Sequence, residues 1–327
     1  MSGMEKMRRS DRMIKQSRNY RSIYLGTLAL FACLGQRFSY AQSPMRVIVE
    51  PNTVSVCRDE QLLLRYCYRG VPFKPYVQRL FSPAGVNILR DAPIDHKHHH
   101  ALMFAVAVDG VNFWEEQRAP GRQEHQAFTD VTVDRHGDIP WAGVTERLAW
   151  LNPNGTELLL NERRTIRLCR LNDPKLTLLT WESRFEVPQG KKSVTLTGSH
   201  YFGLGMRFLE SMDKIGRFLN AHDQPGQVVR GDERLVQSAW CAYSAEADGK
   251  PVTVAMFDHP DNPRPVTWFT MTNPFAYLSA TLNLHKQPLT VLSDKSLRLR
   301  YGVALWDGRM SSELIDRFCH RWAEWPR

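Results

Sequence analysis

Short segments in which hydrophobic and polar residues alternate, or in which β-branched residues gather, recur along most of the chain. Residue pairs that favour tight turns separate several of them: Asp109-Gly110, Asn154-Gly155, Asp248-Gly249 and Asp307-Gly308. Many short strands with few helices predict an all-β fold, a large antiparallel β-sandwich. The segments are Arg46–Glu50, Leu62–Tyr68, Leu102–Val108, Phe128–Val133, Glu157–Leu168, Leu178–Val187, Ser193–Thr197, Val252–Phe257, Val266–Met271, Tyr277–Leu282 and Leu297–Leu305.

The one strong helical pattern lies near the C-terminus. Leu314, Phe318 and Trp322 recur every four residues, which places them on one face of a helix. Ser311 or Ser312 can cap its first turn. We find no linker rich in Gly, Ser or Pro and no internal repeat, so the pattern predicts a single β-sandwich domain over residues 42–327 with a C-terminal helix.

Residues 1–41 have the order of a secretory signal peptide. Basic residues dominate positions 6–21, and the uncharged, mostly apolar run Ile23–Leu34 follows. Small residues then precede a cleavage site that we place after Ala41, so we expect a periplasmic or secreted protein. The apolar run is shorter than the roughly 20 residues that span a bilayer. A retained membrane anchor and a lipoprotein that begins at Cys33 are the alternatives.

The predicted leader carries most of the basic charge. Its loss takes eight Lys and Arg and two Asp and Glu from a chain of net charge +9, which leaves +3. The pI of 9.3 is therefore no argument for a nucleic-acid partner. No later stretch is apolar for long enough to span a membrane as a helix.

Cysteine spacing after the leader matches no zinc-binding motif. Cys57 and Cys67 flank a predicted hairpin and could form a disulfide, but buried unpaired thiols are the favoured interpretation. The five residues are Cys57, Cys67, Cys169, Cys241 and Cys319.

Four histidines lie within five positions, from His96 to His100, before an apolar segment. If the stretch is extended, His96, His98 and His100 share one face with about 6.5 Å between neighbours, which suits a divalent metal ion. Imidazoles can instead transfer protons or hydrogen-bond to hydroxyl groups. A solvated strand end without function is the remaining interpretation.

A turn at Asp109-Gly110 would return Trp114 and Glu115 to the histidines. An exposed Trp ring can pack against the apolar face of a sugar while a carboxylate accepts hydrogen bonds from its hydroxyls. A buried Trp with surface glutamates fits the pattern equally well. His125, close in sequence, is a further candidate for substrate binding.

A second polar stretch, Asp258–Pro265, follows the predicted strand Val252–Phe257. Its three prolines predict a rigid loop at a strand end, where binding residues often lie, although an ordinary exposed turn has a similar composition. A glycine-rich segment, Tyr201–Phe208, adds Arg207. The chain lacks a phosphate-binding loop, a Gly-x-Ser-x-Gly nucleophile, a His-Glu-x-x-His motif and a dinucleotide fingerprint.

These motifs resemble a bacterial family of unknown function (DUF6807-type, PmoA-like), often labelled "methane oxygenase PmoA". The resemblance is compatible with a supersandwich similar to that of the galactose-mutarotase group, in which His and a carboxylate act on sugars by proton transfer. Many members have Arg-Gly where this chain has His100-Ala101, which favours His98 and His99. The resemblance runs from about Ile94 to the C-terminus, and the motifs are Asp95–Phe104, Val111–Trp114, Tyr201–Arg207 and Phe257–Arg264.

The family label implies an oxygenase, but particulate methane oxygenase subunits have several membrane-spanning helices, which this chain lacks after its leader. A copper oxygenase with a histidine brace begins with His, whereas the expected cleavage leaves Gln42. The sequence specifies no cofactor. A divalent metal ion at His96, His98 and His100 is the one candidate.

The leading hypothesis is a carbohydrate-active enzyme, an isomerase, lyase or hydrolase, that acts on a sugar or glycan by acid–base chemistry. A glycan-binding protein without catalysis and a metal-dependent oxygenase are the alternatives. We expect the histidines and the loop Asp258–Arg264 to line one cleft. The candidate catalytic residues are His98, His99, Glu115 and Asp258. The candidate substrate-binding residues are Trp114, His125, Arg207, His259, Asn262 and Arg264.

Overall fold

The computed structural model describes residues 44–137, 139–172 and 175–325. Contacts divide the chain into two units, Met1–Gln42 and Ser43–Arg327, and all the described elements belong to the second. The expected signal peptide, its cleavage site and the lipoprotein alternative lie outside the described residues. Within residues 44–325, apart from the gaps, no helix is long and apolar enough to cross a membrane.

In the described part of the chain, the strands form three antiparallel sheets. A ten-stranded sheet has the order β1 (Met45–Val49), β2 (Thr53–Arg58), β3 (Gln61–Cys67), β4 (Tyr76–Leu80), β5 (Leu102–Ala105), β13 (Gly203–Arg207), β20 (Tyr277–Thr281), β19 (Thr267–Met271), β16 (Glu233–Gln237) and β15 (Gln227–Arg230).

The other two sheets are smaller. An eight-stranded sheet has the order β14 (Arg217–Asn220), β17 (Trp240–Ala247), β18 (Lys250–Asp258), β22 (Leu297–Asp307), β11 (Lys175–Glu186), β10 (Leu158–Asn172), β9 (Ile139–Leu151) and β8 (Arg122–His136). A four-stranded sheet has the order β21 (Leu289–Leu292), β12 (Ser193–Thr197), β6 (Ala107–Val108) and β7 (Val111–Asn112). A 3₁₀ turn, Glu210–Met212, precedes β14.

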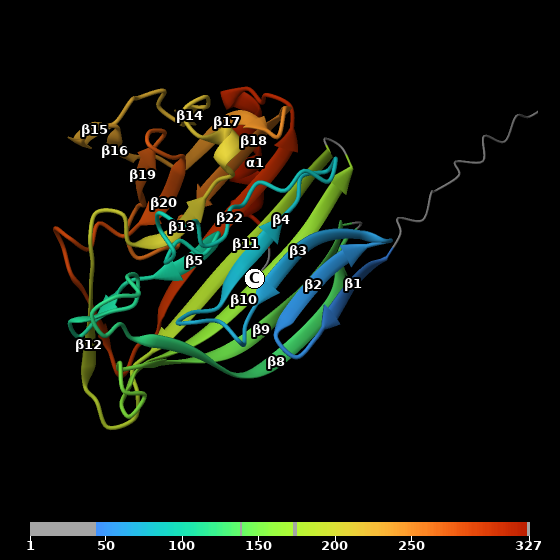
Figure 1. The fold of residues 1–327 in the computed structure, drawn as a ribbon. Coiled ribbons are helices and arrows are strands. Elements are labelled where there is room, and N and C mark those ends of the chain that lie inside the picture. The colour runs from blue at the N-terminus through green and yellow to red at the C-terminus, as the bar shows by residue number, and fades with distance from the viewer. Residues whose placement is uncertain (1–43, 138, 173–174, 326–327) are drawn as a thin grey trace, which may run out of the picture. The chain divides into compact units, whose positions relative to one another are not determined.

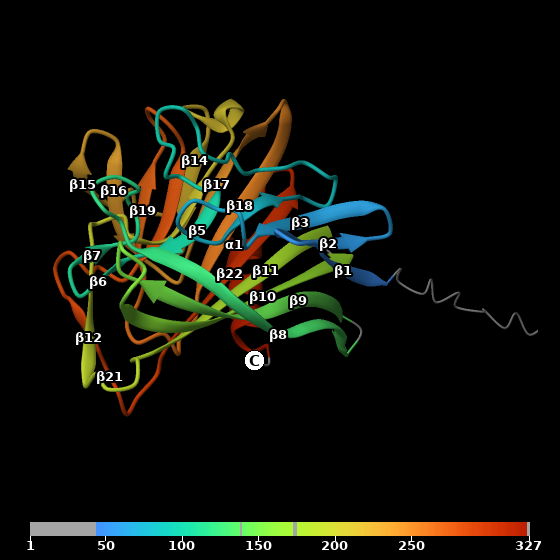
Figure 2. The ribbon, with the colours of Figure 1, turned by 60° about the horizontal axis from the view of Figure 1, so that its bottom comes forward.

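The ten-stranded and eight-stranded sheets pack face to face and share one large hydrophobic core. Strands β1 to β4 lie beside the long strands β8 to β11 (Figures 1 and 2), and a hydrogen bond from Tyr66 in β3 to Glu146 in β9 joins the two layers. The predicted antiparallel sandwich is confirmed. Every predicted strand segment coincides with a strand, but β2, β4, β7, β9, β14 to β17 and β21 were not predicted.

The predicted C-terminal helix is α1, Ser312–Ala323. Ser311 caps it, because its side chain accepts a hydrogen bond from the backbone N–H of Leu314. Its apolar face covers the outer face of the eight-stranded sheet. Trp322 packs closely over Gly302 in β22, where a side chain would collide with its ring.

The described cysteines are all buried and unpaired, as the favoured interpretation predicted. Cys57 lies opposite Leu62 in the β2–β3 hairpin, whereas Cys67 lies opposite Thr53. The two thiols are therefore not cross-strand neighbours, and the alternative of a disulfide between them is wrong.

Candidate functional site

The histidine cluster is not an extended strand. Two successive turns form it, with hydrogen bonds from the His96 N–H to the Pro93 carbonyl at 3.0 Å and from the His99 N–H to the His96 carbonyl at 2.9 Å. The extended strand on which a shared face of His96, His98 and His100 depended is therefore not formed. His96 and His98 still lie close together, with ring centroids 5.7 Å apart, whereas His100 contacts Asp91 and Glu116.

The turn contributes three histidines to a cavity of about 180 Å³. Its walls come from the turn, the segment after β7, the segment before β13, the β15–β16 hairpin and strands β19 and β20, so residues far apart in sequence meet there. The lining residues are His96, His98, His99, Trp114, Glu115, Tyr201, Arg230, Glu233, Phe269, Met271, Phe275 and Tyr277.

His98 and Glu115 form one titratable pair in the wall of this cavity. The Nε2 atom of His98 lies 3.6 Å from Oε2 of Glu115, and the Tyr201 hydroxyl donates a hydrogen bond of 3.4 Å to Oε1 of Glu115. Burial lowers the pKa of His98, and the nearby Lys74 and His96 add to this against the attraction of Glu115. His98 is therefore a neutral base at neutral pH, next to a carboxylate that a tyrosine hydroxyl orients.

Three buried polar atoms in the cavity wall have no hydrogen-bond partner among the described residues: Nδ1 of His99, Nε1 of Trp114 and the hydroxyl oxygen of Tyr277. Each belongs to a side chain that is more than nine-tenths buried. Unsatisfied buried polar atoms are uncommon in native proteins, so three of them in one cavity wall mark it as a candidate binding site. Burial also lowers the pKa of His99, which keeps its ring neutral.

Trp114 is not the exposed platform that a sugar-stacking role requires. Its exposed fraction is 0 %, and its ring stacks on Phe202 at a centroid distance of 5.2 Å. Gly205 in β13 leaves room for Trp114 and Tyr277, because a Cβ atom there would lie 2.7 Å and 2.1 Å from their nearest atoms. Trp114 therefore has no free ring face, and its indole N–H is buried without a partner among the described residues.

His100 lies in a buried ionic row behind the cavity. Its Nδ1 contacts Asp91 at 3.2 Å, and its Nε2 contacts Glu116 at 2.8 Å. Glu116 also accepts a hydrogen bond of 2.5 Å from Lys74, whose side chain is fully buried. Burial opposes the charge of His100, but the two carboxylates outweigh it and raise its pKa.

These contacts argue against the metal site predicted at His96, His98 and His100. Both ring nitrogens of His100 have carboxylate partners, so His100 does not converge with His96 and His98 on a common ion. No group of three His, Cys, Asp or Glu side chains suited to a metal ion occurs in the part of the chain that the structure describes. The candidate ligands do not fit a three-histidine centre.

Arg207, a candidate for binding substrate oxygen, is buried beside the cavity but does not line it. Its guanidinium lies 3.7 Å from the ring centroid of Phe275 and 3.7 Å from a carboxylate oxygen of Asp213. Phe275 is itself part of the cavity wall. The structure therefore gives Arg207 a role in supporting that wall from behind.

The loop Asp258–Arg264 is absent from the wall of the histidine cavity, so the structure does not bring the two predicted clusters into one cleft. Asp258 accepts hydrogen bonds from Asn262 and from the backbone of Val266. Arg264 donates to two backbone carbonyls, those of Leu282 and Gln287. These polar groups bind their own loop and its neighbours, because the loop must satisfy the backbone at the end of β18.

His259 and Asn262 follow the same pattern. The ring of His259 contacts the Ala323 carbonyl at 3.1 Å beside α1, and Asn262 hydrogen-bonds to the backbone of Arg300 in β22. His125 is likewise remote from the cavity, since its Nδ1 lies 2.6 Å from Glu146 in the sandwich interior. Their predicted roles in substrate binding have no support from this placement.

Burial raises the pKa of Asp258 to about 6, against the hydrogen bonds that it accepts. Because the folded-state pKa lies above the unfolded value of about 3.9, the stabilisation is complete below about pH 4 and is lost as pH rises through about 6. We expect the free energy of unfolding to fall between pH 4 and 7.5 by about 2 kcal/mol more in the wild type than in Asp258→Asn. Urea titrations at the two pH values test this. An equal decrease in the free energy of unfolding of the wild type and of Asp258→Asn would contradict this prediction.

Several residues of the site escaped sequence reasoning. Tyr201, Tyr277, Arg230 and Glu233 line the cavity, yet nothing near them in sequence resembles the histidine cluster. Arg230 pairs with Glu233 at 2.6 Å, and Glu233 also contacts His200 at 3.0 Å. Gly205, which lets the rings of Trp114 and Tyr277 approach β13, was the available signal.

By its fold and its site, the protein is a large antiparallel β-sandwich with a cavity lined by histidine and carboxylate groups. The chain belongs to a family of unknown function (DUF6807), whose model matches residues 53–319. The resemblance seen in the sequence is thereby confirmed at the level of this family. No curated protein matches the chain.

Solved structures of similar fold include alpha-galactosidases and a mutarotase-related protein. The GH36 alpha-galactosidase AgaA from Geobacillus stearothermophilus is 11 % identical (TM-score 0.43), with 81 % of this chain and 41 % of that chain covered. An alpha-galactosidase from Lactobacillus brevis is 5 % identical (TM-score 0.45; 82 % and 40 % covered). A galactose mutarotase related enzyme from Lactobacillus acidophilus is 8 % identical (TM-score 0.36; 81 % and 100 % covered). The chain thus spans about two fifths of the alpha-galactosidases' length, and the likeness concerns the fold alone.

Proposed function

We propose that the protein is an exported carbohydrate-active enzyme that uses His98 and Glu115 for acid–base chemistry on a small sugar. The observation that carries this proposal is the neutral His98 beside Glu115, in a cavity whose wall also holds unpartnered polar atoms of His99, Trp114 and Tyr277. A volume of about 180 Å³ is below the range of about 300–1,000 Å³ typical of drug-sized ligands and suits one sugar residue.

In this proposal His98 removes a proton from the sugar, and Glu115 stabilises the imidazolium that forms. The Tyr201 hydroxyl holds Glu115 in place through its hydrogen bond. The distance of 3.6 Å between His98 and Glu115 is long for a hydrogen bond, and such contacts commonly shorten when substrate binds. Asp258 has no part in the step, because its carboxylate bonds within its own loop.

The two alternatives have less support. A glycan-binding protein would present an aromatic face, but the Trp114 ring is covered by Phe202. An oxygenase would require converging metal ligands, and His100 is engaged by Asp91 and Glu116. The proposal therefore rests on proton transfer within the cavity.

The first experiment uses Glu115→Gln and a panel of monosaccharides, with turnover measured by nuclear magnetic resonance or by release of reducing ends. Loss of the partner carboxylate should lower turnover by about 10²-fold, the low end for acid–base groups. Glu115 favours protonation of His98, so its loss should also move the acidic limb of kcat/KM to lower pH.

Glu60→Gln is the matched control, since Glu60 is 98 % exposed in the turn between β2 and β3. It should leave both turnover and the pH profile unchanged. A Glu115→Gln enzyme with wild-type turnover on the sugars that the wild type converts would refute the assignment of this pair.

A further inference from the structure

Four arginines form a row across the outer face of the eight-stranded sheet. Arg147 in β9 lies directly opposite Arg163 in β10, Arg163 lies opposite Arg184 in β11, and Arg184 lies opposite Arg298 in β22. We call these four residues the arginine row. Neighbouring strands are about 4.8 Å apart, so the row extends over about 14 Å.

Without neutralising partners, such a row destabilises the folded protein. Like charges that lie directly opposite on neighbouring strands repel each other and destabilise the sheet. Carboxylates offset only half of the row: Arg184 pairs with Glu186 at 3.0 Å, and Arg298 pairs with Glu182 at 2.6 Å. Among the described residues, no carboxylate pairs with Arg147 or Arg163, and both are exposed. An external anion would satisfy them.

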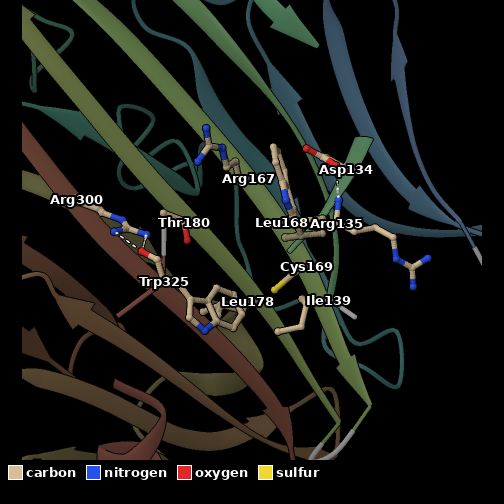
Figure 3. Close-up of a pocket in the computed structure, with 11 residues that line it drawn as sticks. Asp134, Arg135, Ile139, Arg167, Leu168, Cys169, Leu178, Thr180, Arg300 and Trp325 are labelled. Atoms are coloured by element: carbon tan, nitrogen blue, oxygen red, sulfur yellow. Dashed lines mark hydrogen bonds between the residues drawn. The ribbon is translucent and has the colours of Figure 1, made fainter. Parts of the chain in front are cut away.

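Two hollows lie near the row: three of its arginines line the first, and the second lies farther along β10 and β22. One, of about 580 Å³, is lined by Arg147, Arg163 and Arg184 together with Glu162, Glu186, Leu148 and three uncharged polar residues. The other, of about 230 Å³, lies beside the end of α1, and Trp141 lines it. Arg167, Arg300 and Asp134 also contribute to its wall (Figure 3).

The second hollow adds an aromatic surface and more positive charge. The guanidinium of Arg167 lies 4.8 Å from the ring centroid of Trp141, and Arg167 has no carboxylate partner in the part of the chain that the structure describes. Arg163, Thr165 and Arg167 alternate along β10 with residues of the opposite face, so the two arginines share the outer face of the sheet. The positive charge therefore continues along β10 from one hollow to the other.

We infer that this face binds a chain of carboxylate-bearing sugars, such as a polyuronate, along the arginine row. Guanidinium groups match carboxylates in a two-point geometry, and a linear polyanion presents charges at regular spacing, as the row does. The choice of a carbohydrate over another polyanion rests on the proposed function. The surface itself is separate from the histidine cavity, since the two share no residue.

The test compares the binding of an oligogalacturonate of about ten sugars with that of a neutral galactan of equal length, by calorimetry on the whole protein. The wild type should bind the acidic chain, more weakly as salt increases, and should not bind the neutral chain. The double variant Arg147→Gln/Arg163→Gln should bind at least about tenfold more weakly, since it loses charge-assisted hydrogen bonds. Arg217→Gln, on β14 of the same sheet, should bind as the wild type does.

Equal weakening by Arg217→Gln, or binding of the neutral chain as tight as that of the acidic one, would overturn the inference. So would tighter binding of a sulfated polysaccharide or of a single-stranded oligonucleotide of equal charge. His98→Ala should bind oligogalacturonate as the wild type does. The two proposals can therefore fail separately. Substitutions in the histidine cavity change turnover, whereas substitutions in the arginine row change the binding of oligogalacturonate.

Discussion

Replacing His98 by alanine should lower turnover of the sugar substrate by roughly a hundredfold or more, while sugar affinity stays within a few fold. The substitution removes the neutral imidazole that lies 3.6 Å from Glu115 in the cavity. It leaves the unpartnered polar atoms of His99, Trp114 and Tyr277 in place to bind hydroxyl groups. Steady-state kinetics together with calorimetric titration separate the two effects.

Lys97→Ala is the control, because Lys97 is the exposed neighbour of His98 in the same turn. This substitution should change neither turnover nor sugar affinity. Parallel losses of affinity and turnover in His98→Ala would point to a binding role, and release of a stoichiometric metal ion would support the oxygenase alternative. Unchanged turnover in His98→Ala would show that His98 is not the catalytic base.

Replacing Arg164 by methionine should lower the free energy of unfolding by about 3–5 kcal/mol, the usual effect of removing one partner of a buried ion pair. Arg164 and Glu162 are fully buried, and two hydrogen bonds of 2.8 Å join them. Arg164 also donates to the Tyr66 hydroxyl and to Gln123, so its loss leaves several buried acceptors unsatisfied. Chemical denaturation followed by circular dichroism measures the change.

Arg163→Gln is the matched control, one residue away on the opposite face of β10. It should not destabilise the protein, and at low salt it should stabilise it slightly, since it relieves repulsion from Arg147 and Arg184. The double variant Glu162→Leu/Arg164→Met should recover part of the loss, because no buried charge stays unpaired. Equal effects of Arg163→Gln and Arg164→Met would contradict this account.

The fold was largely predictable because strand alternation and a capped helix are local patterns. Leu178–Val187 and Leu297–Leu305 carry their strand signal within their own residues, and they became β11 and β22. Strand β9 was missed, since both of its faces are largely buried and its residues do not alternate clearly. Its place in the sheet depends on the strands to either side.

The site was predictable only in part, because it depends on contacts between distant segments. His98 and Glu115 could be paired from a turn signal, since they are close in sequence. Tyr201, Tyr277 and the β15–β16 hairpin reach them only through the order of strands in the ten-stranded sheet. The loop Asp258–Arg264 was wrongly predicted to line the same cleft. Its polar residues satisfy backbone groups locally, and composition does not distinguish that use from ligand binding.

The resistance of the protein to thiol oxidation depends on its folded state, because the fold buries all five described thiols. Burial raises the pKa of each, which keeps them protonated and unreactive in the folded protein. An unfolded chain would expose all five at once, at ordinary reactivity. In an oxidising medium such a chain would form mispaired and intermolecular disulfides faster than it refolds. Its lifetime on heating would then be set by the rate of unfolding, and a reductant would make thermal unfolding more reversible.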